Sequence, residues 1–357
     1  MDKILTFPYF GDYTIAFKSL FGEDKNILLT PPNKKTMELG VKNSPEFICL
    51  PYKISIGNMI ENISKGANTV LMLKLNALTF EGECRLAYYA LLQDIVLRNN
   101  NPKIDFMPVS LQGVETFKSL KTINPERNYF KIIKDVMLFL IKIHLVDKIN
   151  SLNYYYTPRE AKKGASQELK KKSLKQVDLT NSLLGLFILR KNISLNYAQI
   201  PLVENKKVLK IGVIGEIYMV HENFINNDLH DFLSSNGVEV HNLVTLSHFL
   251  KYSFFKKSTI NKMNKITGKY ISDHVGGHGL DSVAHLLESK KEGFDGVIHL
   301  LPFGCMPESS VRPILNKIAN DKKIPLLSLS LDEHTGKAGF VTRVEAFLDM
   351  MENKRSA

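Results

Sequence analysis

The sequence VLKIGVIGEIYMV at residues 208–220 decides the fold class of this chain. It is an apolar, β-branched run with glycines at its centre, which is typical of a strand buried in a parallel sheet. Further strand-like runs follow at residues 238–244, 296–301 and 324–331, separated by stretches with helical patterns such as residues 227–235, and a helix at about residues 339–351 closes the chain. This alternation predicts a mostly parallel α/β architecture of the Rossmann-like kind.

The same alternation is present nearer the N-terminus, where the patterns predict three strands and four helices. The middle of the chain, residues 101–203, is largely helical by pattern, with strong apolar stretches at residues 130–145 and 183–189. We therefore expect an N-terminal α/β domain at residues 1–205, with a helical insertion at about residues 101–205, and a C-terminal Rossmann-like α/β domain at residues 206–357. The expected N-terminal strands are residues 3–9, 26–30 and 67–73, and the expected helices are residues 14–21, 33–39, 51–65 and 85–98.

Composition narrows the class of protein. The 357 residues are 44% hydrophobic and 23% charged, the balance of an ordinary soluble globular protein. No apolar run approaches the ~20 residues that a membrane span requires. The N-terminal sequence MDKILT lacks the pattern of a signal peptide. We therefore expect a cytoplasmic protein without a membrane partner.

The formal net charge of +11 raises the question of a nucleic-acid partner. Much of the excess comes from residues 161–175, which carry six lysines against the single acid Glu168. No base-stacking aromatic residues accompany these lysines, and no nucleic-acid-binding motif occurs elsewhere. Such a lysine-rich run is more often a solvated helix face, so no nucleic-acid partner is predicted.

Three cysteines, Cys49, Cys84 and Cys305, are the candidate reactive residues. An odd number of widely spaced cysteines without an export signal argues against a disulfide framework. Each one directly precedes a predicted helix, where the helix dipole and free amides favour a thiolate and lower the pKa of the thiol. In an open α/β sheet, such loops line the crevice beyond the carboxyl ends of the strands. By spacing alone, buried structural thiols or a zinc site completed by His278 remain open as alternatives.

Several motifs are similar to one known family. They cover residues 1–98 and 208–357 and resemble the acyl-CoA dehydratase activase-related proteins, also called CoA protein activases. Two positions depart from the pattern, with Asp12 in place of Asn and Ala87 in place of Gly. The motifs are TFPYFG at 6–11, ICLPYK at 48–53, GECRLAYY at 82–89, GVIGEIY at 212–218, GGHG at 276–279, DGVIH at 295–299, PFGCMPE at 302–308, LDEHTG at 331–336 and TRVEAF at 342–347.

The resemblance extends to the 2-hydroxyacyl-CoA dehydratase component and to the double-cubane-cluster proteins. It implies that Cys49, Cys84 and Cys305 bind an iron–sulfur cluster in a crevice between the Rossmann-like domains. The cluster would be a 4Fe–4S cluster in each chain, or a larger cluster shared between chains, and the protein would form a homodimer or heterodimer. An ATP-dependent activator ATPase with its own iron–sulfur cluster would supply a low-potential electron. The electron would pass to a small substrate such as an acyl-CoA thioester.

Two other functions are compatible with the sequence. The chain could be a scaffold or regulatory subunit that carries a cluster without catalysing a reaction; a catalytic protein should have a closed pocket at the cluster. It could also be a nucleotide-binding α/β protein, although residues 212–215 do not form the Gly-x-Gly-x-x-Gly fingerprint and no Walker loop is present.

No catalytic residue is predicted. Several polar residues have both a functional and a structural interpretation, as crevice groups or as ordinary caps, turns and surface positions, and these are Arg85, Glu216, His278, Asp332, Glu333, His334 and Arg343.

Overall fold

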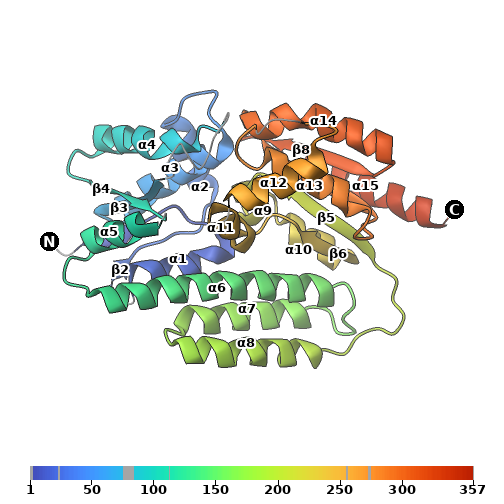
Figure 1. The fold of residues 1–357 in the computed structure, drawn as a ribbon, viewed down its shortest axis with the longest axis horizontal. Helices are drawn as coiled ribbons and strands as arrows, with labels where there is room; N and C mark the ends of the chain where they lie inside the picture. The colour runs from blue at the N-terminus through green and yellow to red at the C-terminus, as the bar shows by residue number, and fades with distance from the viewer. Residues whose placement is uncertain are drawn as a thin grey trace.

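The structure, a computed structural model, describes residues 3–22, 25–74, 84–111, 113–254, 256–271 and 275–356. It contains two four-stranded sheets, each with helices packed around it, that lie side by side (Figure 1). All strand pairs in both sheets are parallel. The predicted α/β class with Rossmann-like parallel sheets is confirmed. In the described part of the chain, no helix is both long and apolar enough to cross a membrane.

The first sheet has the strand order β2-β1-β3-β4. Its strands are β1 (Ile4–Thr6), β2 (Asn26–Ile27), β3 (Thr69–Lys74) and β4 (Asp105–Ser110). The helices of this region are α1 (Thr14–Phe21), α2 (Lys34–Lys42), α3 (Leu50–Ser64), α4 (Leu86–Asn100) and α5 (Gly113–Ile123), and a 3₁₀ turn at Gly11–Tyr13 precedes α1.

The second sheet repeats this plan with the order β6-β5-β7-β8. Its strands are β5 (Leu209–Gly215), β6 (Val238–Asn242), β7 (Gly296–Pro302) and β8 (Leu326–Leu331). Every residue of β7 is buried, as expected of a central strand in a parallel sheet. The helices here are α9 (Ile217–His221), α10 (Leu229–Ser235), α11 (Leu246–Phe254), α12 (Lys256–Thr267), α13 (Gly279–Ser289), α14 (Met306–Lys322) and α15 (Lys337–Ser356).

A layer of three helices connects the two halves of the molecule along one side (Figure 1). It consists of α6 (Tyr129–Tyr156), α7 (Ala165–Leu179) and α8 (Leu183–Ala198). Helix α6 has 28 residues and is therefore roughly 42 Å long. It contacts α1 and α5 beside the first sheet and β6, α10 and α11 of the second. This single helix therefore packs against both halves of the chain.

Two elements differ from the sequence prediction. The strand expected across residues 208–220 ends at Gly215, and α9 follows it. Gly215 has a φ of +125°, and a Cβ there would lie 1.9 Å from the carbonyl oxygen of Leu300, so the chain must leave the sheet at a glycine. Residues 101–203 were expected to be largely helical, but β4 at Asp105–Ser110 forms an edge strand of the first sheet. The boundary near residue 205 remains a prediction, and residues 82–83 of the GECRLAYY motif lie outside the described residues.

Candidate active site

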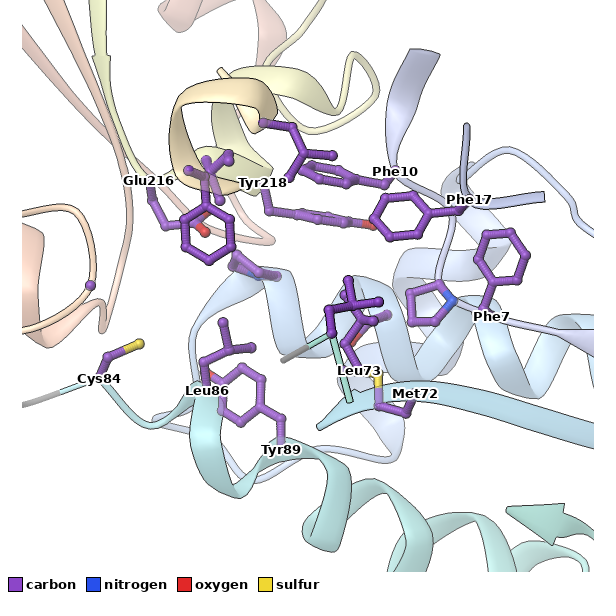
Figure 2. Close-up of a pocket in the computed structure, with 18 of the residues that line it drawn as sticks. Phe7, Phe10, Phe17, Met72, Leu73, Cys84, Leu86, Tyr89, Glu216 and Tyr218 are labelled. Carbon is purple, nitrogen blue, oxygen red and sulfur yellow. The ribbon is translucent and has the colours of Figure 1, made fainter. Parts of the chain in front are cut away.

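A cavity of about 200 Å³ lies at the carboxyl ends of four strands. Its walls include Phe7 beyond β1, Cys84 in the segment between β3 and α4, Glu216 beyond β5 and Cys305 beyond β7. Each sheet changes its direction of winding between two of these strands, β1 and β3 in the first sheet and β5 and β7 in the second. Such switch points are where open α/β sheets bind ligands. The cavity therefore joins the switch points of both sheets (Figure 2).

The three cysteines stand at the starts of three helices. Cys49 and Cys305 are the N-cap residues of α3 and α14, with extended backbone, and each helix has a proline in its first turn. Proline fits there because the first amides of a helix have no partner within the helix. Cys84 directly precedes Arg85, the N-cap residue of α4. The predicted setting of all three cysteines before a helix is confirmed.

Arg85 holds the three cysteine segments together. Its Nη2 atom donates a hydrogen bond to the carbonyl oxygen of Phe47 at 3.1 Å and another to that of Gly304 at 2.7 Å. Phe47 lies two residues before Cys49, and Gly304 lies one residue before Cys305. One guanidinium group, adjacent to Cys84 in sequence, therefore connects the backbones that carry the other two cysteines.

The thiols lie at or next to one end of the cavity. Cys84 and Cys305 line it directly, and all three cysteines are partly buried and free of disulfides. The Cys49 thiol instead contacts the hydroxyl of Tyr89, whose ring lines the cavity. Gly277 completes this end: its φ is +51°, and a Cβ there would lie 3.1 Å from Pro307 and 3.8 Å from the Cβ of Cys84. Residues from four separate segments thus meet at the cysteine end of the cavity.

Burial dominates the ionisation of the thiols. It raises the pKa of Cys84 to about 11 and also raises the pKa values of Cys49 and Cys305. Backbone amides act in the opposite direction, those of Tyr52 on Cys49, Leu86 on Cys84 and Glu308 on Cys305. The expectation of lowered thiol pKa values was wrong, because removal from water outweighs the helix N-terminus. Metal binding at these thiols would have to release their protons.

Two carboxyl groups, those of the partly buried Glu216 and the fully buried Glu308, share this end of the cavity with the cysteines. Glu216 accepts the backbone N–H of Met219 at 2.9 Å, and burial raises the pKa of its carboxyl to about 7. It both lines the cavity and caps α9, so the functional and structural interpretations of this residue are compatible. Glu308 contacts Nε2 of His299 at 2.8 Å, and both side chains are fully buried. Ser282 donates a further hydrogen bond to Glu308 at 3.0 Å.

The other polar candidates separate into cavity and non-cavity residues. His278 lines the cavity and lies 3.6 Å from Asp281, so the Gly-rich segment does bring a histidine to the cysteine end. Asp332, Glu333 and His334 form a turn that does not line it; Asp332 accepts the backbone N–H of His334, and Glu333 pairs with the buried Lys53 of α3.

Arg343 also lies outside the cavity wall, on α15, where its guanidinium donates a hydrogen bond to the carbonyl oxygen of Ser328. For Arg343 and the 332–334 turn, the structural interpretation is the better one.

The described residues do not support the zinc alternative. No three of their His, Cys, Asp and Glu side chains are arranged so that they could hold one metal ion. A 4Fe–4S cluster is bound differently, by cysteines that each take a different iron, so its ligands need not converge on a single point. Three thiols at or next to one end of a cavity, each with a backbone amide donor, are the type of donor set that such a cluster uses.

Sequence reasoning missed the aromatic walls of the cavity. Phe10 stacks on Tyr218 with ring centroids 5.4 Å apart, and Phe7 and Phe17 lie beyond them on the side away from Cys84 (Figure 2). The clustering of six aromatic residues within residues 7–21 was the available signal. A local pattern could not indicate that these rings face a cavity.

Comparison with known proteins relates part of the C-terminal half of the chain, from α9 into α15, to one enzyme family. Residues 217–351 match the family model of the 2-hydroxyglutaryl-CoA dehydratase D-component. The match supports the resemblance to 2-hydroxyacyl-CoA dehydratase components and does not extend to the activase-related subgroup. The D-component match includes Cys305, His278 and Glu308 and leaves Cys49 and Cys84 outside it. No curated protein matches the chain.

Proposed function

We propose that this chain is the iron–sulfur component of a system of the 2-hydroxyacyl-CoA dehydratase type. Cys49, Cys84 and Cys305 would hold the cluster, as a 4Fe–4S cluster within one chain or as a larger cluster shared by two chains. An ATP-dependent activator with its own cluster would deliver a low-potential electron, which the bound cluster would transfer to a thioester substrate. The observation that carries this proposal is the meeting of three cysteine segments, joined by Arg85, at one end of a cavity.

The residues of the chain would orient and shield the reacting groups. Three thiolates would leave one iron of a four-iron cluster without a cysteine ligand, and a bound cluster would supply the low-potential electron for the reaction. The apolar side chains that line the rest of the cavity would limit the access of water to a substrate bound there. Glu216, with its pKa of about 7, lines the same end of the cavity and holds a proton on its carboxyl near neutral pH. Dehydration needs a proton for the departing hydroxyl group, and Glu216 can supply it.

The alternative, a scaffold that carries a cluster without catalysis, has less support. A scaffold has no need of a cavity at its cluster, whereas Cys84 and Cys305 both line one. The cavity therefore favours the catalytic function.

Anaerobic purification with iron and sulfide analysis and EPR tests the ligand assignment. Cys49→Ala, Cys84→Ala and Cys305→Ala should each lose iron and change the EPR signal of the reduced protein. Ser309→Ala, an exposed position in the first turn of α14, is the matched control and should keep both. Unchanged iron and sulfide content in all three cysteine variants would refute the proposal.

A further inference from the structure

The part of the cavity away from the cysteines is lined by apolar side chains. It is walled by α1, the ends of β3 and β4, α6 and α11, elements that lie far apart in the sequence. An apolar cavity of about 150 Å³ can hold a benzene ring, so a cavity of about 200 Å³ has room for a phenyl group or a short alkyl chain. Its walls include Phe17, Phe21, Leu73, Val109, Phe139 and Leu250.

Apart from His278 and two tyrosines, the described ionisable side chains that line the cavity are two carboxyl groups and two thiols, which lie at its cysteine end. Glu216 and Glu308 lie there with Cys84 and Cys305, and none of the described lining residues is a lysine or arginine. A carboxylate carried into the apolar part would therefore lose its hydration and find no lysine or arginine partner among these residues. Burial of an unpaired charge is strongly unfavourable. The lining thus selects against a ligand with an anionic tail.

We infer that the cavity binds the uncharged alkyl or aryl group of an acyl thioester, with the thioester end at the cysteines. The identity of the reacting end rests on the proposed function, and the identity of the tail rests on the cavity walls. The family model that matches residues 217–351 is described by a glutaryl thioester, whose acyl group ends in a carboxylate. The cavity of this chain points instead to an acyl group such as hexanoyl or 3-phenylpropanoyl.

Competition for a neutral fluorescent probe tests this inference on the full-length chain. N-phenyl-1-naphthylamine would fill the cavity, and N-acetylcysteamine thioesters of hexanoate, 3-phenylpropanoate and glutarate would compete with it. The hexanoyl and phenylpropanoyl thioesters should displace the probe at concentrations at least tenfold lower than the glutaryl thioester. From butanoyl to hexanoyl, each added methylene should tighten binding by roughly two- to fourfold, as expected for transfer out of water. Equal or stronger competition by the glutaryl thioester would overturn the inference.

Two variants that fill the cavity locate the bound ligand. Val109→Phe in β4 and Leu73→Phe in β3 should each weaken binding of the hexanoyl thioester by at least tenfold. Val114→Phe, the same change at a position of α5 that is 70% exposed, is the matched control and should leave binding unchanged. Leu73 is only partly buried, so its variant keeps the test available if Val109→Phe does not fold. Wild-type affinity in a folded Leu73→Phe protein would place the ligand elsewhere and refute the assignment.

The competition should be run on metal-free protein and on protein reconstituted with iron and sulfide. Preference for the apolar thioesters in a chain that takes up no iron would support the tail assignment and overturn the proposed cluster. Preference for the glutaryl thioester in an iron-loaded chain would overturn the tail assignment alone. The two proposals therefore fail in distinguishable ways.

Discussion

Replacement of Arg85 by methionine tests whether one guanidinium group holds the cysteine segments together. Methionine keeps an unbranched stem but removes both hydrogen bonds, to the carbonyl oxygens of Phe47 and Gly304. A hydrogen bond from a charged donor contributes about 1.5–3 kcal/mol when buried. One of these bonds is exposed and the other partly buried, so about 1 kcal/mol each is the appropriate value. Loss of both bonds should therefore destabilise the arrangement in which the three cysteine segments lie together by about 2 kcal/mol. This corresponds to a roughly thirtyfold smaller population of that arrangement.

Two measurements on Arg85→Met separate alignment of the cysteines from overall folding. Urea unfolding followed by circular dichroism gives the change in stability, and iron and sulfide content after anaerobic reconstitution reports the alignment. We expect a modest loss of stability and at least a twofold loss of iron. Arg98→Met removes an arginine from the same helix, where it pairs with Asp94 at the surface, and should change stability by less than about 0.5 kcal/mol and leave iron unchanged. Wild-type stability and iron content in Arg85→Met would refute this role for Arg85.

Two further predictions concern packing and pH. Gly57→Ala should destabilise the fold by about 1–3 kcal/mol in urea unfolding, because the new Cβ would lie 2.0 Å from a carbonyl oxygen of α2. Gly339→Ala in α15 is the control. Its new Cβ would have no atom within 4 Å, so this change should be neutral or slightly stabilising. Burial opposes ionisation of Glu239, but hydrogen bonds from His241 and Arg159 outweigh it and lower the pKa of this carboxyl from 4.5 to about 2. The ionised Glu239 carboxylate therefore stabilises the fold fully above pH 4.5, and this contribution is lost as the pH falls toward 2. Glu239→Gln should cost about 2 kcal/mol at pH 7 and much less at pH 3, and an equal cost at both pH values would contradict this reasoning.

The sequence contained enough local information for the fold class and for the setting of the cysteines. Buried parallel strands such as β7 are continuous apolar runs, which are recognisable without a structure. The prolines that follow Cys49 and Cys305 marked the starts of α3 and α14 to within one residue. Strand β4 was missed because its pattern, DFMPVS, contains a proline and lies at the start of a segment, residues 101–203, that is dominated by helices. Proline at a sheet edge is tolerated, so the edge position of β4 explains the ambiguous signal.

The electrostatics and the shape of the site depend on contacts that no local pattern encodes. The thiols were expected to have lowered pKa values because a helix N-terminus is a local feature, whereas their burial arises from the packing of two sheets. Arg85 donates hydrogen bonds to Phe47 and Gly304, which lie 38 and 219 positions away from it in the sequence. Helix α6 packs against both halves of the molecule and supplies Phe139 to the cavity. Such long-range contacts require the folded chain.

The origin of the cavity walls limits what the family match can say about the substrate. Within residues 217–351, the matched segment supplies Cys305, His278 and Glu308, which belong to the cysteine end. Most of the apolar wall, from Phe17 of α1 to Phe139 of α6, comes from the first 140 residues, outside that match. The matched segment also adds Leu250 of α11 to the apolar wall, and Cys84 and Glu216 of the cysteine end lie outside the match. A shared reacting end is compatible with a different acyl group, because most of the residues that would select the acyl group lie outside the matched segment.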